Sequence, residues 1–380
     1  MFLDYEILRL LWWAILGILL IGFAILDGFD LGMAIFLPFL GKSDEERRLM
    51  INSIGPIWEG NQVWLILGAG ASFAAWPYLY AVSFSGFYLA MFIALFGLVL
   101  RPVGFKFRSK MPDVRWRNFW DAIIFMGGFV PSLIFGVAFG NLFLGVPFHF
   151  DDTLRLYYTG SFLELLTIFP LMCGVLSIGM MLLQASTYGS LKTRDALQNK
   201  FRKSGQWVII GIIILFTGTG LYLYQEIPGH MLLEPWAKEA PSNPLYKQVA
   251  TLDKGWFLNY IKFPWSLALP IGAYLSLFLT FFFLKSRRFG PAFFTSSCAV
   301  GGIISTAGAS LFPFLLISST HPSQSLTIWD ASSSKTTLFI MLIATLIFLP
   351  IIIAYTAWVY RVLKGPVTSK TLEDEQLNAY

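Results

Sequence analysis

The sequence has little charge. Only 13% of its 380 residues are Asp, Glu, Lys or Arg, whereas soluble domains carry about 25%. Hydrophobic residues make up 56%. This composition excludes an ordinary soluble domain and indicates an all-α, polytopic membrane protein, with residues 1–380 forming a single integral membrane domain. The net charge of +5 requires no nucleic acid as a partner.

Residues that bind metals or act as nucleophiles are also few. The two cysteines, Cys173 and Cys298, lie in apolar runs, so no disulfide framework is indicated. The three histidines, His149, His230 and His321, fall in loops. No apolar run offers a histidine pair for a haem, and no Cys or His cluster has the spacing of metal ligands. The sequence therefore predicts no catalytic, metal or cofactor-binding residue in this chain, and any redox centre is expected in another chain.

Apolar runs long enough to cross a bilayer dominate the chain, since a spanning helix needs roughly 20 residues. Nine such runs are predicted: residues 8–38, 54–75, 78–100, 119–143, 161–186, 206–225, 263–284, 291–317 and 336–360. The first run is longer than a bilayer requires, so it is expected to kink or to project from the membrane. Trp76, Pro77 and Tyr78 are typical of a tight turn between the second and third runs.

The distribution of basic residues predicts the orientation. Of 27 Lys and Arg residues, about 20 fall in the odd-numbered loops and the C-terminal tail. Lys and Arg are enriched in cytoplasmic loops, so the N-terminus is expected outside and the C-terminus in the cytoplasm. The longest outside loop, residues 226–262, is an ordinary connection or a candidate lid.

Five acidic residues lie within these runs or at their ends: Asp27, Asp30, Glu59, Asp121 and Glu164. A carboxylate in the bilayer core costs roughly 2.5–3.5 kcal/mol, so each acid needs a reason. Asp121 and Glu164 are expected in the first turns of their helices, where they would satisfy backbone amides and favour the helix dipole. Asp27 and Asp30 share one helical face because they are three residues apart.

Three polar residues are expected at one depth near the cytoplasmic surface. Asp30 lies late in the first run, Glu59 early in the second, and Arg101 at the end of the third. Acids beside an arginine could form a buried ion pair, or a water-lined route for protons from the cytoplasm. We expect Arg101 to pair with Asp30 and Glu59 to stay free to titrate. Asn61 and Gln62 could hold water beside Glu59, whereas Arg101 alone could be an ordinary positive-inside anchor.

Ordered motifs along almost the whole chain resemble subunit II of the cytochrome bd-type quinol oxidases. They are DYEILRLLWW, DGFDLGM, ERRLMINSIGPIWEGNQVWLI, FAAWPYLYAVSFSGFY, RPVGFKFRSK with RWRNFWD, FGVAFGNLFLGVPF, LRLYYTGSF, SNPL, TAGASLFPF, SLTIWDASSS and YTAWVYR. The resemblance implies nine membrane helices in a bacterial inner membrane. It also implies a partner subunit I carrying haems b and d, with small accessory subunits as further partners. That complex would oxidise quinol, reduce O2 to water and generate a proton gradient.

The resemblance also implies roles for particular residues. Asp30, Glu59 and Arg101 match positions thought to line a cytoplasmic proton route, and Trp64 would lie near an entrance for O2. For Trp64, packing is an equal alternative. Relatives often carry His where this chain has Ile57, so a route that needs that imidazole fails here.

Two other functions fit the polar residues in the apolar runs. A secondary transporter or channel also carries acids within the membrane, although an odd number of spans without an evident inverted repeat fits many transporter folds poorly. A purely structural partner of a haem subunit is the other alternative. Copurification of a haem-bearing chain separates the oxidase from the transporter.

Overall fold

The computed structural model describes residues 3–233 and 239–368 of this chain. The helices are α1 (Tyr5–Leu40), α2 (Asp44–Ile54), α3 (Trp58–Ala75), α4 (Pro77–Gly86), α5 (Tyr88–Arg108), α6 (Val114–Leu144), α7 (Ile168–Lys192), α8 (Asp195–Glu226), α9 (Leu258–Lys262), α10 (Ala268–Lys285), α11 (Phe289–Leu311) and α12 (Lys335–Val362). Three short antiparallel pairs are β1 (Phe148–Phe150) with β2 (Leu156–Tyr158), β3 (Gly229–Leu232) with β4 (Val249–Leu252), and β5 (Phe314–Leu316) with β6 (Leu326–Thr327). Four 3-10 turns complete the set: η1 (Leu163–Leu165), η2 (Gly255–Phe257), η3 (Pro264–Leu267) and η4 (Pro322–Gln324).

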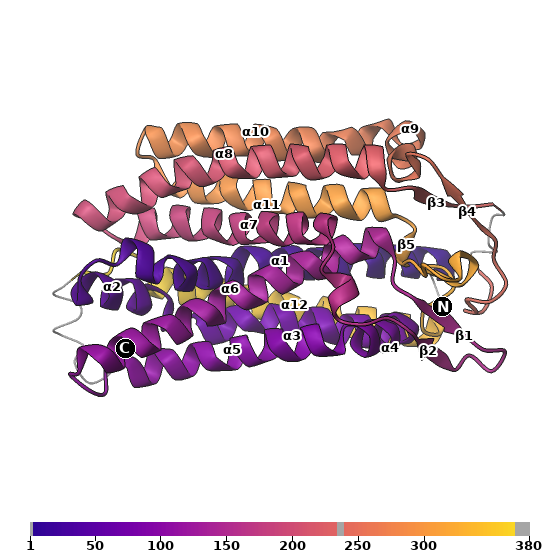
Figure 1. Ribbon diagram of the computed structural model, residues 1–380, viewed down its shortest axis with the longest axis horizontal. Helices are drawn as coiled ribbons and strands as arrows, with labels where there is room; N and C mark the ends of the chain where they lie inside the picture. Colours follow the sequence, from indigo (N-terminus) through magenta and orange to yellow (C-terminus); the bar gives the residue numbers. More distant parts are fainter. Residues whose placement is uncertain (1–2, 234–238, 369–380) are drawn as a thin grey trace.

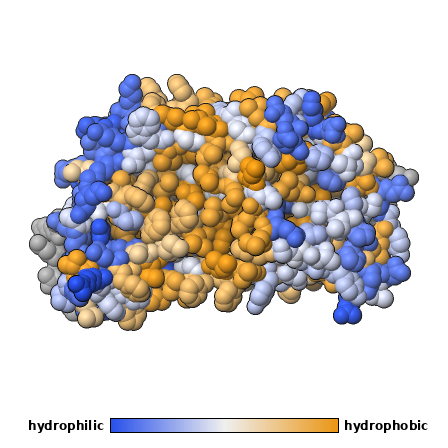
Figure 2. Space-filling view, in the orientation of Figure 1, coloured by the Kyte–Doolittle hydropathy of each residue, from blue (hydrophilic) through white to orange (hydrophobic). Residues whose placement is uncertain are grey.

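The long helices lie side by side, and the two ends of the bundle differ (Figure 1). All three strand pairs and the start of α1 are at one end, which we call the hairpin end. The other end, which we call the α2 end, carries α2 and the turn that joins α5 to α6. Figure 2 shows an apolar belt between two more polar ends, as expected for a protein whose flanks face lipid.

Within the described residues, eight helices are long and apolar enough to cross a membrane. They are α1, α5, α6, α7, α8, η3 with α10, α11 and α12. The predicted run without a counterpart among these eight is the second, residues 54–75, which corresponds to α3. The 18 residues of α3 would extend about 27 Å. Glu59, Asn61 and Gln62 lie in the first turns of α3, and this short helix has no room for a more apolar window of the same length.

The third predicted run differs from the structure. We expected one helix over residues 78–100, closed by Arg101 at the membrane surface. Instead α4 begins at Pro77, Phe87 interrupts the helix, and α5 runs on to Arg108. Pro102 does not end the helix, and Arg101 is fully buried within it. Between α3 and α4 only Trp76 is non-helical, and Pro77 and Tyr78, which we expected in a tight turn, begin α4.

The fifth and eighth runs also need correction. The fifth begins as a helix only at α7, because Glu164 lies in the separate turn η1, where its carboxylate accepts a hydrogen bond from the Ser161 backbone at 3.2 Å. The eighth helix, α11, ends at Leu311, and residues expected to continue it form β5 instead.

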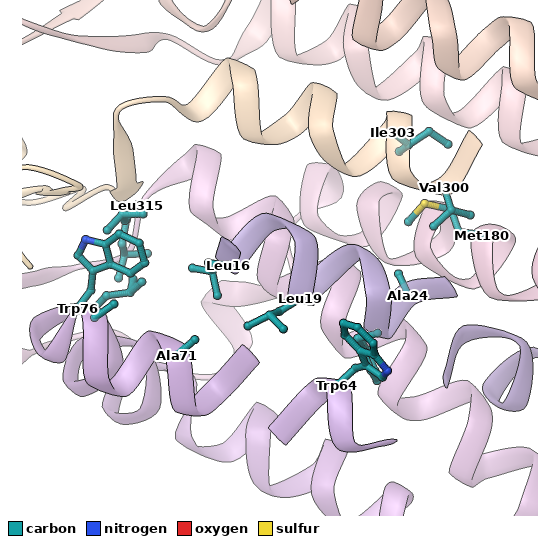
Figure 3. Close-up of a cluster of buried hydrophobic side chains, with 14 of the residues drawn as sticks. Leu16, Leu19, Ala24, Trp64, Ala71, Trp76, Met180, Val300, Ile303 and Leu315 are labelled. Atoms are coloured by element: carbon teal, nitrogen blue, oxygen red, sulfur yellow. The ribbon is translucent and has the colours of Figure 1, made fainter. Parts of the chain in front are cut away.

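Helix α1 packs at the centre of the bundle, against α3, α6, α7 and α11. Its contact with α7 is so close that a Cβ at Gly32 would lie 2.0 Å from the Met181 carbonyl oxygen. Only glycine permits this approach of two backbones. On the side of α1 that contacts α3, an apolar cluster contains Leu16, Leu19 and Ala24 together with Trp64 of α3 (Figure 3).

An ion-pair cluster closes the α2 end. Asp121 accepts hydrogen bonds from Arg108 Nε at 2.5 Å and from Arg47 at 2.7 Å. Asp44 of α2 pairs with Arg108 at 2.9 Å and with Arg117 at 3.0 Å. Our expectation that Asp121 caps a first turn was wrong: α6 begins seven residues earlier at Val114, so Asp121 is a buried bridge between α6, α5 and the start of α2.

Candidate functional site

A buried ion pair joins α1 to α5. Arg101 Nη2 donates to Asp27 Oδ1 at 2.7 Å, and both side chains are 0% exposed. The sequence predicted that Arg101 would have a carboxylate partner but assigned it to Asp30, so that assignment was wrong. Asp27 and Asp30 lie on one face of α1, and the spacing of the motif DGFD allowed either to be the partner.

Asp30 belongs to a second group of hydrogen bonds, which joins α1, α3 and α12. Asn61 Nδ2 donates to Asp30 Oδ2 at 2.8 Å, and the Tyr360 hydroxyl donates to Asn61 Oδ1 at 2.8 Å. Sequence reasoning missed Tyr360, because its motif YTAWVYR gives no sign of which aromatic residue faces the core. The amide of Asn61 is fixed by a donor on one side and an acceptor on the other, so it holds the Asp30 carboxylate in place.

These buried groups keep unused hydrogen-bonding capacity. Asp27 Oδ2, Asp30 Oδ1 and the Nε and Nη1 atoms of Arg101 have no direct partner among the described residues. A carboxylate oxygen and guanidinium donors in this state can accept or donate a further hydrogen bond. Buried polar atoms normally use that capacity. Asp27, Asp30 and Arg101 are therefore chemically suited to bind water or an exchanging proton.

Glu59 and Gln62 lie elsewhere. Glu59 is in the first turn of α3 but is exposed on the surface of this chain, while Asn61 is buried at 1% exposure. Gln62 is half-buried, and no hydrogen bond is assigned to its side chain in the part of the chain that the structure describes. Of the five predicted residues, the structure therefore brings Asp30, Asn61 and Arg101 into the buried interior beside Asp27, and leaves Glu59 on the outer face of α3.

Trp64 packs one turn further along α3. It is 8% exposed, and a Cβ placed on Gly22 of α1 would lie 2.5 Å from its ring. Figure 3 shows the ring directed at α1 beside Leu19 and Ala24. This environment supports the packing alternative for Trp64.

The hairpin end has polar contacts of its own. Lys247 pairs with Asp330 at 2.9 Å, with both side chains almost fully buried. Burial raises the pKa of Asp330, and the Lys247 ammonium opposes that rise. Lys335 begins α12 and lines a cavity of about 460 Å³ together with Tyr5, Glu239 and Ser332. The predicted lid loop contains β3, β4, η2 and α9, and residues 234–238 lie outside the described residues.

The histidines gather at one end of the molecule, far from the buried acids. No group of three His, Cys, Asp or Glu within them could hold a metal ion. All three histidines are at the hairpin end: His149 in β1, His230 in β3 and His321 just before η4. The ring centroids of His149 and His321 are 4.9 Å apart, which is too close for axial ligands on opposite faces of a haem plane.

Fold and site together define a polytopic membrane subunit whose interior carries an ion pair and a carboxylate hydrogen-bonded across three helices. Residues 8–363 match the cytochrome bd terminal oxidase subunit II family, and the chain belongs to that family. It is 45% identical over 378 residues to the probable cytochrome oxidase subunit 2 of Haemophilus influenzae, with both chains fully covered. It is 46% identical over 379 residues to the cytochrome bd-I ubiquinol oxidase subunit 2 of Escherichia coli K12, again over the full length of both.

More distant relatives agree. The cytochrome bd ubiquinol oxidase subunit 2 of Bacillus subtilis is 30% identical over 95% of this chain and 97% of its own length. A solved structure of the bd oxidase from Geobacillus thermodenitrificans matches with a TM-score of 0.69 at 16% identity, covering 93% of this chain and 98% of that chain. This second likeness supports the fold. The chain is thus a multi-pass protein of the bacterial inner membrane and a subunit of a terminal oxidase complex.

Proposed function

We propose that this chain is the haem-free partner of a haem-bearing subunit I, in a complex that oxidises quinol and reduces O2 to water. Similarity over 95–100% of this chain to proteins named ubiquinol oxidase subunit 2 supports a quinol as the substrate. The placement of all three histidines at the hairpin end, none of them within a long helix, supports assigning haems b and d to the partner. Small accessory subunits are further proposed partners.

The contribution we propose for this chain is a route for protons toward the partner's oxygen site. The observation that carries it is the buried Asp30 carboxylate, held by Asn61 and, through Asn61, by Tyr360. An amide does not relay protons in this arrangement, because its nitrogen donates and its oxygen accepts. Asn61 is therefore a positioning residue, and the proton-carrying atom is the remaining oxygen of Asp30, Oδ1.

Arg101 and Asp27 set the electrostatics of this route. Arg101 is neutralised by Asp27 at 2.7 Å, so its charge does not hold Asp30 permanently ionised. In this proposal Asp27 is the paired acid and Asp30 exchanges protons, whereas we expected Asp30 to be paired with Arg101 and Glu59 to be free. Gln62 remains a proposed contributor at the half-buried edge of α3.

Glu59 is proposed to connect this interior to the partner subunit. It shares a surface stripe of α3 with Val63, Ile66, Gly70 and Phe73, at spacings of three or four residues. A carboxylate facing lipid is costly, and a Cβ at Gly70 would meet nothing within 4 Å. Small residues on an outer helix face allow another helix to approach closely. We therefore infer that the stripe meets subunit I and that Glu59 faces it.

The decisive experiment compares Glu59→Gln with Glu59→Asp in the assembled complex. Gln keeps the size and hydrogen bonding of Glu59 but carries no proton, so quinol oxidase turnover should fall at least several-fold in Glu59→Gln and be largely kept in Glu59→Asp. Haem content should stay normal in both. The matched control is Asp152→Asn, an exposed acid at the hairpin end, which should run at the parental rate.

If Glu59→Gln turns over at the parental rate across the pH range, Glu59 carries no protons and this part of the proposal is wrong. If haem content falls with turnover in Glu59→Gln but not in Glu59→Asp, the residue stabilises the complex instead.

A role for Trp64 at an O2 entrance stays a prediction. The apparent affinity of the Trp64→Phe complex for O2, measured in the same preparation, tests it.

We also propose that α3 completes nine membrane helices, with the hairpin end outside and the α2 end in the cytoplasm. The support is the excess of Lys and Arg in the segments at the α2 end. An odd number of spans agrees with the start of α1 and the end of α12 lying at opposite ends.

A further inference from the structure

Two histidines far apart in the sequence meet at the hairpin end. The ring centroids of His149 and His321 are 4.9 Å apart, with the ring planes inclined at 37°. His149 is half-buried and stacks on Tyr157 at 5.3 Å, whereas His321 is exposed. The backbone N–H of His321 donates to Ser318 Oγ at 3.1 Å. This bond uses no imidazole nitrogen, and among the residues that the structure describes no hydrogen bond is assigned to either ring. The ring nitrogens can therefore bind a ligand.

The two backbones that carry these rings are fixed against each other. The Gln324 side chain accepts from the Phe150 N–H at 2.7 Å and donates to the Phe150 carbonyl at 3.2 Å. On the other side of His149, the hydroxyls of Ser318 and Thr320 both donate to the Phe148 carbonyl. The residues flanking His149 are thus bound to the residues flanking His321, and the ring pair is held in place before any ligand arrives.

We propose that His149 and His321 form a binding site for a divalent transition-metal cation such as Zn²⁺. Two imidazole nitrogens at about 2.0–2.1 Å from a tetrahedral Zn²⁺ place their ring centroids about 5 Å apart, close to the observed separation. Neutral imidazole is a favoured ligand for Zn²⁺, Cu²⁺ and Ni²⁺. Mg²⁺ and Ca²⁺ prefer oxygen ligands, which the pair does not offer.

A cation at this site would exchange with solution and would not be a permanent structural metal. Structural zinc sites have four protein ligands, whereas this one supplies two and leaves the other positions to water. A bound cation would join β1 to the turn before η4, and so fasten the β1–β2 hairpin to the segment that follows α11. This site is separate from the buried acids at the other end of α1, and it does not depend on the proposed proton route.

The test is metal content of the purified, untagged oxidase complex after equilibrium dialysis against Zn²⁺. His149→Gln and His321→Gln should each bind one equivalent less than the parent. The double variant should lose no more than either single variant, because one ligand without the other makes no site. Excess Mg²⁺ should not displace this equivalent. The matched control is His230→Gln, which removes a histidine from the same end of the molecule and should keep the full content.

The thermal midpoint of the complex provides a second measurement. Zn²⁺ should raise the midpoint of the parent and of His230→Gln, and EDTA should reverse the rise, because a ligand that binds only the folded state stabilises it. The rise should be lost in either variant of the pair. Equal Zn²⁺ content in the parent and the double variant overturns the proposal and leaves a tilted pair of rings without a ligand. Losses that add up in the double variant also overturn it, because they indicate two independent sites.

Discussion

At the scale of single residues, the arrangement of the buried polar groups depends on which acid pairs with Arg101. Asp27 and Asp30 are one turn apart on α1, yet Asp27 pairs with Arg101 of α5 and Asp30 with Asn61 of α3. The two acids therefore differ in what their removal leaves behind. Loss of Asp27 leaves a buried guanidinium without a counter-charge, whereas loss of Asp30 leaves an amide that can bond to its replacement.

This difference predicts opposite outcomes for two conservative substitutions. Asp27→Asn should destabilise the complex by roughly 3–5 kcal/mol, the usual cost of removing one partner of a buried ion pair. Asp30→Asn should assemble with normal haem content but turn over slowly, because the amide cannot carry a proton. Haem content and turnover of the two purified variants check this prediction. Normal assembly of Asp27→Asn with failed assembly of Asp30→Asn would reverse our assignment.

At the scale of elements, helix α2 is the clearest case of local sequence setting local structure. Ser43 and Glu46 form a reciprocal capping box, and Glu46 also pairs with Lys200 of α8 at 2.6 Å. Partial burial opposes ionisation of Glu46, but hydrogen bonds from Lys200 and from the Lys42 and Ser43 backbone outweigh it and lower its pKa below 4.5. A carboxylate with a lowered pKa stabilises the fold while it is ionised.

The consequence is a pH-dependent difference between two variants. The thermal midpoint of Glu46→Gln should lie below that of the parent at neutral pH, and the gap should close as the pH falls below 4.5 and through the lowered pKa of Glu46. Ser43→Ala loses the uncharged half of the cap, worth about 0.5–2 kcal/mol, so its gap should persist over the same range. A pH-independent gap for Glu46→Gln would show that its charge contributes nothing.

At the scale of the whole molecule, the hairpin end and the α2 end are built differently. The hairpin end has long connections with strand pairs, whereas the α2 end has short turns, α2 and most of the basic residues. A positive-inside bias over short loops sets membrane orientation. The fold therefore predicts on which side each end is found in the cell.

Single cysteines test that orientation and the number of spans together. In a background without Cys173 and Cys298, Lys110→Cys at the α2 end should react with an impermeant thiol reagent only from the cytoplasmic side. Asp253→Cys, beside the exposed end of β4, should react only from outside. Labelling of both from one side would rule out nine spans. Lys238, in the same outer loop, lies outside the described residues, so Asp253 is the better position.

Much of the fold follows from the sequence, because long apolar runs can only be helices in lipid. Two of the errors lie where polar residues continue a helix. Arg101 and Pro102 suggested an end to the third span, but burial against Asp27 lets α5 extend to Arg108. Asp121 suggested a cap, but two arginines from other elements make it a bridge. Two contacts depend on how each helix is rotated about its axis: the pairing of Arg101 with Asp27 and the bond from Tyr360 to Asn61. The spacing of hydrophobic residues in the sequence does not determine that rotation.

Helix α1 carries Arg9 near one end and Asp27 near the other, both fully buried. Between them every side chain of α1 is apolar or absent, over a rise of about 27 Å. Such a stretch acts as an electrical insulator. Moving one charge against 100 mV requires about 2.3 kcal/mol. A proton returning from the hairpin end would meet no titratable side chain on α1 between Arg9 and Asp27. If the buried acids carry protons as we propose, this stretch of α1 separates them electrically from the hairpin end.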